Sequence, residues 1–168
     1  MRDALLADDA RLLAECEVDT YRASGPGGQK RNKTDSAVRL RHKPSGLSVI
    51  AEESRSQAEN RGRALRRLQK ELALRLREPA PDGVPESVRN CIDSSGRLKV
   101  GQRDKRYLPA VAAVLDILEG SRGSVSDAAR RLGVTTGNLS AFLTSDDDVM
   151  VEANRIRATH VMRPLRRD

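Results

Sequence analysis

The chain has 168 residues, which fits one domain or a small domain with an appendage. Its 31 Lys and Arg residues outnumber 24 Asp and Glu residues, giving a formal net charge of +7. Two cysteines make no disulfide framework, and the longest apolar run, Leu108 to Leu118, is interrupted by Asp116 and too short to cross a bilayer. These properties argue against a secreted, membrane-inserted or zinc-finger protein, and we expect a cytoplasmic monomer with no metal and no cofactor.

The first half of the chain predicts a mixed α and β unit. Asp8 or Asp9 can cap an early helix, and Val18 is expected to face inward from the first strand. Alternating apolar and basic residues predict a hairpin with a Pro and Gly turn, and Ser56 with Glu59 forms a capping-box pattern. The predicted order is a helix at 3–15, a strand at 17–22, a loop at 23–33, strands at 36–42 and 47–51, and a helix at 56–77.

The second half predicts helices only. Four Pro and Gly residues between 79 and 85 indicate a linker, after which apolar residues recur at helical spacing. We expect helices at 108–119, 126–132, 137–143 and 147–158. The fold class is therefore α+β, a small mostly antiparallel sheet with a long packed helix (1–77), followed by a linker (78–104) and an all-α module resembling a helix-turn-helix (105–168).

Positive charge is concentrated in one block. Between Arg22 and Arg77 the sequence holds 15 Lys and Arg residues but 5 Asp and Glu residues. Such a block favours a polyanionic partner, although a basic face can also serve only to keep a small domain dissolved. With one Phe, two Tyr and no Trp, the chain has few platforms for stacking on bases, so nucleic acid would be bound through phosphates and shape.

The glycine-rich loop from Ser24 to Lys30 reads Ser-Gly-Pro-Gly-Gly-Gln-Lys. Its spacing fits neither a P-loop nor the dinucleotide-binding pattern, and no Ser/His/Asp set accompanies it, since His42 and His160 both suit structural positions. Glycines let the main chain approach another molecule closely, and Gln29 offers an amide with no titratable group. That chemistry suits water attacking an ester, with a backbone N–H stabilising the developing oxyanion.

The string from Arg22 to Arg39 resembles the Gly-Gly-Gln signature of class I peptide chain release factors, and the resemblance continues through His42, Pro44 to Gly46, Ser54 to Gln57 and Asn60-Arg61. It covers residues 9–77. The family often has His-Val where this chain has Lys30-Arg31. The resemblance implies a loop that enters the peptidyl transferase centre and promotes hydrolysis of the ester between the nascent peptide and the P-site tRNA.

By this resemblance, Gly27 and Gly28 shape the loop and Gln29 acts at the ester. The expected partners are the rRNA of the large ribosomal subunit and the P-site peptidyl-tRNA. The residues expected to contact rRNA or tRNA are Arg22, Ser24, Gly25, Lys30, Arg31, Asn32, Lys33, Thr34, Arg61, Arg66 and Arg67.

Decoding release factors carry a stop-codon-reading domain before the Gly-Gly-Gln domain, whereas about 20 residues precede the loop here. The chain therefore resembles the small rescue factors that release peptides from stalled ribosomes without reading a codon. Those proteins often end in a basic tail that occupies the mRNA channel of the small subunit. The residues expected to form such a docking tail are Arg155, Arg157, Arg163, Arg166 and Arg167.

Residues 126–139 have the pattern of a helix-turn-helix, with Ala129 at the helix contact and Gly133 at the turn. The second helix, 137–143, contains no Lys or Arg, which favours a packing or docking unit over a DNA reader. Two alternatives to a peptidyl-tRNA hydrolase stay open. One is a non-catalytic ribosome-binding factor of the same fold, and the other is a nucleic-acid-binding regulator that uses the helix-turn-helix.

Overall fold

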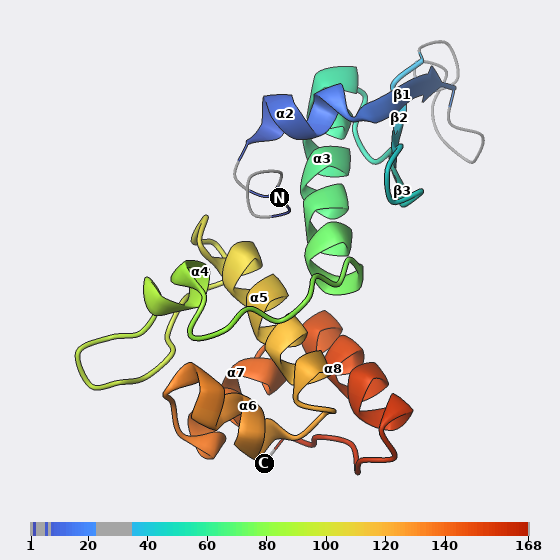
Figure 1. Cartoon of the computed structure of the whole chain (residues 1–168). Coiled ribbons are helices and arrows are strands. Elements are labelled where there is room, and N and C mark those ends of the chain that lie inside the picture. Colours follow the sequence, from blue (N-terminus) through green and yellow to red (C-terminus); the bar gives the residue numbers. More distant parts are fainter. Residues whose placement is uncertain (1, 3–5, 7, 23–34, 168) are drawn as a thin grey trace. The chain divides into compact units, whose positions relative to one another are not determined.

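The computed structural model describes residues 2, 6, 8–22 and 35–167, and these form two compact units, Met1–Leu72 and Ala73–Asp168. The predicted α+β class is confirmed (Figure 1). Among the described residues, no helix is long and apolar enough to cross a membrane. The elements in chain order are α2 (Asp9–Ala14), β1 (Cys16–Tyr21), β2 (Ala37–His42), β3 (Ser48–Ala51), α3 (Gln57–Arg75), α4 (Glu86–Arg89), α5 (Tyr107–Gly120), α6 (Val125–Leu132), α7 (Thr136–Thr144) and α8 (Asp147–Thr159).

The first unit is built on a three-stranded antiparallel sheet in the order β1-β2-β3. In the central strand, Val38 and Leu40 are buried while Arg39 and Arg41 are exposed, so the predicted alternation is confirmed. The turn between β2 and β3 contains Gly46 at a φ of +72°, a left-handed conformation that glycine adopts without a Cβ clash.

The edge position of β1 changes the expected burial of Val18. Val18 lies opposite Leu40 in the ladder, so both side chains are on the same face of the sheet. Leu40 is fully buried, but Val18 is 40% exposed, because an edge strand has a neighbour on one side only. The expected burial of Val18 is therefore wrong, and the buried residue of β1 is Cys16.

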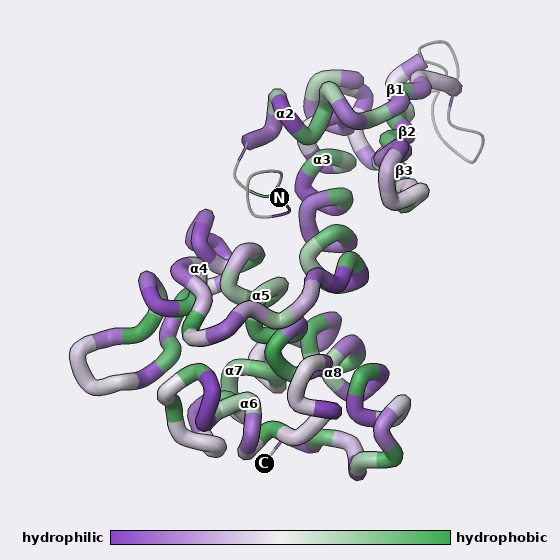
Figure 2. The backbone as a smooth tube through the Cα atoms, viewed as in Figure 1, coloured by the Kyte–Doolittle hydropathy of each residue, from purple (hydrophilic) through white to green (hydrophobic). Residues whose placement is uncertain are grey.

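Two helices of the first unit begin where local capping predicts. Asp8 caps α2, its carboxylate accepting hydrogen bonds from the N–H groups of Ala10 and Arg11. Ser56 precedes α3 and accepts from the N–H of Glu59 at 3.3 Å. Along α3 the apolar stripe is buried at Leu65, Leu68 and Leu72, and the basic residues between them alternate with it in Figure 2. Of the early helix predicted at 3–15, residues 3–5 and 7 lie outside the described residues.

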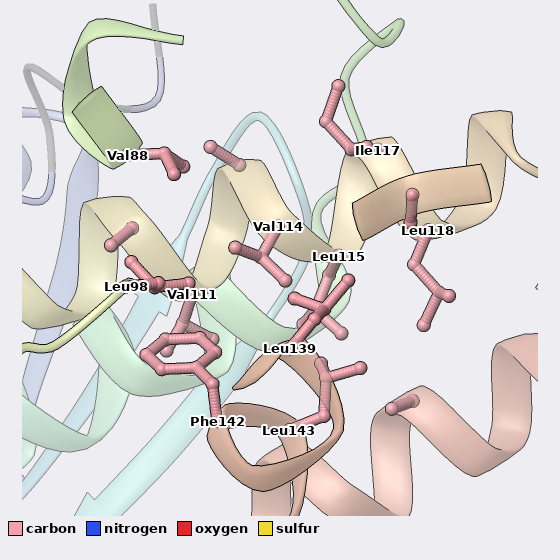
Figure 3. Close-up of a cluster of buried hydrophobic side chains, with 14 of the residues drawn as sticks. Val88, Leu98, Val111, Val114, Leu115, Ile117, Leu118, Leu139, Phe142 and Leu143 are labelled. Atoms are coloured by element: carbon pink, nitrogen blue, oxygen red, sulfur yellow. The ribbon is translucent and has the colours of Figure 1, made fainter. Parts of the chain in front are cut away.

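The second unit packs around α5, whose residues from Ala110 to Leu118 are all buried (Figure 3). Segment 78–104, expected to be a linker, contributes to this core. It contains the short helix α4 and an isolated antiparallel bridge between Ile92 and Leu98, and Val88 and Leu98 are buried beside α5. Pro85 directly precedes α4, and the prolines of the segment do not keep it out of the core.

The helices predicted at 108–119, 126–132, 137–143 and 147–158 are confirmed within two residues as α5 to α8. Gly133 ends α6 at a φ of +71° and makes the predicted turn. Thr135 then caps α7 by accepting from the N–H of Asn138, and Asp146 caps α8. Ala129 is buried, in agreement with its expected place between packed helices.

Candidate nucleic-acid interface

Strands β1 and β2 flank the glycine-rich loop. Tyr21 and Ala37 form the last pair of the β1–β2 ladder, and beyond it the Nε of Arg22 contacts the carboxylate of Asp35 at 3.2 Å. The residues between them, 23–34, lie outside the described residues. The roles expected for Ser24, Gly25, Gly27, Gly28, Gln29, Lys30, Arg31, Asn32, Lys33 and Thr34 therefore stay predictions.

The first turn of α3 holds the chain where it leaves this loop. The side-chain nitrogen of Gln57 donates to the carbonyl oxygen of Asp35 at 2.9 Å. The Nδ2 of Asn60 donates to the carbonyl oxygens of Ser36 at 2.7 Å and Ser54 at 2.8 Å, and its Oδ1 accepts from the N–H of Ser54 at 3.0 Å. Two side chains of one helical turn thus fix the two consecutive residues, Asp35 and Ser36, that precede β2.

Asn60 is fully buried, and its amide hydrogen-bonds backbone groups of Ser36 and Ser54, which lie outside the strands and helices. Reasoning from the sequence matched Asn60 and Gln57 to the release-factor string but gave neither a role in the site. A signal was present, since Asn60, Ala64 and Leu68 are spaced by four residues and share the buried stripe of α3. A polar residue on such a stripe indicates a specific hydrogen-bonding task.

Three arginines of α3 were predicted to contact RNA, and they have different surroundings. Arg61 and Arg66 are exposed. The guanidinium of Arg67 instead donates to the carbonyl oxygen of Ile50 and to the carboxylate of Glu53, which ties α3 to the end of β3. The hydrogen bond from Arg67 lowers the pKa of Glu53. Arg67 therefore has a structural task in addition to any contact with RNA.

The outward face of the sheet is also basic, but its cations are paired across the strands. Arg39 donates to Asp19 at 2.7 Å, and Arg41 lies 3.5 Å from Glu17. The hydrogen bond with Asp19 raises the pKa of Arg39.

His42 is buried, with Ser45 at 2.7 Å from Nδ1 and Glu15 at 3.2 Å from Nε2. The two contacts of His42 agree with the structural position expected for this residue.

Of the five arginines predicted to form a docking tail, three bind groups of the second unit. Arg155 pairs with Glu152 at 2.7 Å, Arg157 donates to the carbonyl oxygen of Arg163 at 2.6 Å and to that of Gly123, and Arg167 pairs with Asp147 at 2.5 Å. Asn154 also hydrogen-bonds both backbone groups of Leu165. The C-terminal segment up to residue 167 is thus folded against α8, and its role as a docking tail stays a prediction.

Part of the described surface carries exposed cations. Arg22, Arg61 and Arg66 present exposed guanidinium groups that suit phosphate oxygens. Within the described ranges, no cluster of three or more His, Cys, Asp or Glu residues could hold a metal ion.

A family model described as "RF-1 domain" matches residues 13–107, which include the whole loop and helix α3. This chain belongs to the RF-1 domain family. Its membership confirms the resemblance seen in the string from Arg22 to Arg39.

Curated relatives agree with the RF-1 domain assignment. The chain is 33% identical over 140 residues to "Peptide chain release factor 1" of Leptospira biflexa, covering 83% of this chain and 35% of the relative. It is 36% identical over 139 residues to the protein of the same name from Fusobacterium nucleatum, covering 83% of this chain and 34% of the relative. The chain thus matches about a third of the length of these relatives.

Proposed function

We propose that this RF-1 domain chain promotes hydrolysis of the peptidyl-tRNA ester in the peptidyl transferase centre of the ribosome. The observation that carries the proposal is the family match over residues 13–107, because that span includes Gly27, Gly28 and Gln29. The names of the relatives connect the family with peptide chain release. Release of the nascent peptide is the reaction that such a loop would serve.

In this proposal Gln29 acts at the ester. Gly27 and Gly28 carry no side chains, which leaves room for the main chain to approach the tRNA end. The backbone N–H of Gln29 donates to the oxyanion or to the leaving hydroxyl, and its side-chain amide helps to place water. Oxyanion donors of this kind contribute about 3–4 kcal/mol to lowering the barrier. Arg22, Arg61 and Arg66 contact the phosphates of rRNA or tRNA.

We further propose that release by this chain does not depend on the codon in the A site. The matched span, which is about a third of each relative, already includes the motif that acts at the ester. The second unit is helical, and its helix α7 contains no Lys or Arg with which to contact a nucleic acid. Stalled ribosomes that lack a stop codon are the substrate this arrangement favours.

The test is peptide release from purified ribosomes that carry labelled peptidyl-tRNA and no stop codon. Wild type is compared with Gln29→Ala and Gly28→Ala, and co-sedimentation with ribosomes is measured on the same samples. Release by wild type that the variants lose, with their binding retained, supports the proposal. Binding of wild type without release identifies a non-catalytic factor of the same fold and overturns it.

A further inference from the structure

Four cations of the second unit lie close together in the sequence and outside the interface described above. They are Arg97, Lys99, Arg103 and Lys105, and we call them the 97–105 patch. All four side chains are exposed, and none forms a salt bridge with any residue in the described part of the chain. The turn that holds the last two is strongly hydrophilic, as Figure 2 shows just before α5.

The acidic residues of this segment are occupied elsewhere. Asp93 closes its own turn by accepting from the N–H and hydroxyl of Ser95, at 2.9 and 2.6 Å, and from the N–H of Arg97 at 3.1 Å. Asp104 binds the guanidinium of Arg106, with its carboxylate 3.0 Å from Nε and 2.6 Å from Nη2. The nearby charges of Arg97 and Lys105 also help to lower the pKa of Asp93 and of Asp104, but neither carboxylate forms an ion pair with a side chain of the patch in the described part of the chain.

The backbone beneath the patch is fixed from several sides. Between Arg97 and Lys99, Leu98 is buried, and both of its backbone groups are hydrogen-bonded by Asn138 of α7 at 2.8 and 3.2 Å. The N–H of Lys99 donates to the carbonyl oxygen of Cys91 at 2.9 Å. Arg97 and Lys99 flank the bridge residue Leu98, and both side chains are exposed while Leu98 enters the core.

The C-terminal arginines contrast with this patch. Arg155, Arg157 and Arg167 already bind groups of their own unit, and a phosphate would have to displace these contacts. The cations of the patch require no such exchange, and their ordered backbone lowers the entropy lost on binding. Arginine and lysine together suit phosphate oxygens, the first through a planar fork and the second as a point charge.

We propose that the 97–105 patch binds the phosphate backbone of ribosomal RNA and docks the second unit on the ribosome. The inference deepens the proposed function and rests on it for the choice of RNA as the partner. It gives the helical unit a role in binding that does not require the C-terminal segment to unfold from α8.

The experiment compares two full-length variants with the same loss of charge. The patch variant carries Arg97→Gln, Lys99→Gln, Arg103→Gln and Lys105→Gln. The control carries Arg89→Gln, Arg122→Gln, Arg130→Gln and Arg131→Gln, which are exposed in the same unit and lie outside both the patch and the predicted docking tail. Binding to a labelled 20-nucleotide uridine strand is measured by fluorescence anisotropy over a salt series, and binding to purified ribosomes by co-sedimentation. Circular dichroism confirms that both variants are folded.

Each neutralised phosphate contributes about 0.7 to the slope of log affinity against log salt for a single strand. We expect the patch variant to lose about 3 from this slope and at least tenfold in affinity for the strand and the ribosome. The control should change less than threefold. Equal losses in both variants would overturn the inference, because they would reflect net charge alone. Weaker ribosome binding with unchanged RNA binding would also overturn it, since a protein would then be the partner.

Both readouts measure binding, so they separate this inference from the proposed reaction. A chain that binds RNA through the patch but releases no peptide contradicts the proposed function alone. A chain that releases peptide equally well with and without the patch, and binds RNA equally well, contradicts the docking inference alone.

Discussion

The side-chain nitrogen of Asn60 donates to the carbonyl oxygen of Ser36 over 2.7 Å, joining the first turn of α3 to the residue that precedes β2. Asn60 is fully buried, and its side chain makes three hydrogen bonds to backbone groups. It connects segments that are 24 residues apart in the sequence. Through this contact, helix α3 fixes the position of the chain just after the glycine-rich loop.

Replacing Asn60 should destabilise the first unit strongly. Asn60→Ala removes this partner from the carbonyl oxygen of the buried Ser36 and from the carbonyl oxygen and N–H of the half-buried Ser54, and a group left unsatisfied away from water costs about 1–3 kcal/mol. We expect a loss of about 3 kcal/mol in the free energy of unfolding, measured by urea denaturation. Arg61→Ala, one residue along and exposed, should change it by less than about 0.5 kcal/mol. Equal effects of the two substitutions would contradict this account of Asn60.

Gln57 makes a similar hydrogen bond from an exposed position. Its substitution can therefore test the positioning of the loop's end without a large change in the stability of the fold. Gln57→Ala removes the hydrogen bond to the carbonyl oxygen of Asp35 without opening the core. Small misplacements of reacting groups can slow a reaction by up to about a hundredfold. We expect the rate of peptide release to fall about tenfold, with the midpoint of unfolding and the affinity for ribosomes unchanged. A rate equal to wild type would show that this contact does not position the loop.

Val161 occupies the left-handed position that follows helix α8, with a φ of +57°. The N–H groups of Val161 and Met162 donate back to Ala158 and Arg157, which is the Schellman pattern that glycine normally completes. A residue with a Cβ destabilises the folded chain there by about 1–2 kcal/mol. Glycine removes this cost, but it also gives the unfolded chain more backbone freedom, which destabilises the folded state by about 0.5–1 kcal/mol. Because the Val161 side chain is 95% exposed, little packing is lost. Val161→Gly should raise stability by about 0.5–1 kcal/mol in thermal unfolding, and a lower melting temperature would contradict the strain.

The pair of Asp104 and Arg106 gives a pH dependence on the acid side. The hydrogen bonds from Arg106 lower the pKa of Asp104 to about 2, below its ordinary value near 3.9. Because the folded pKa is the lower one, the stabilisation is present above about pH 4 and is lost as the pH falls toward 2. Asp104→Asn should flatten the fall in stability between these two pH values while leaving the rest of the profile in place. An unchanged profile would show that the pair does not contribute.

Much of the fold could be predicted because its signals are local. The alternation in β2, the Ser56 cap and leucine spacing of α3, and the periodicity of α5 to α8 each lie within a few residues. Contacts made across the chain left no such signal. Nothing near Asn138 indicates that it binds the backbone of Leu98, 40 residues away, so segment 78–104 was expected to be a linker.

The residues of the site could be predicted only in part, for the same reason. The loop motif and the arginines of α3 were recognisable, whereas the positioning contacts of Gln57 and Asn60 require the pairing of β1 with β2 and the packing of α3. The exposure of Val18 likewise depends on strand order, which places β1 at an edge. Arg157 and Arg167 bind groups of their own unit because the C-terminal segment folds back on α8. The number of charges in that segment does not indicate such a fold.

The most direct measurement is the single-turnover rate of peptide release by the wild-type chain on ribosomes with a stop codon, a sense codon or no codon in the A site. The account predicts release on all three at rates within about twofold of one another, and loss of all three with Gln29→Ala. Release that requires the stop codon would contradict codon independence. Absence of release on every complex, with the chain bound, would contradict the hydrolytic function itself.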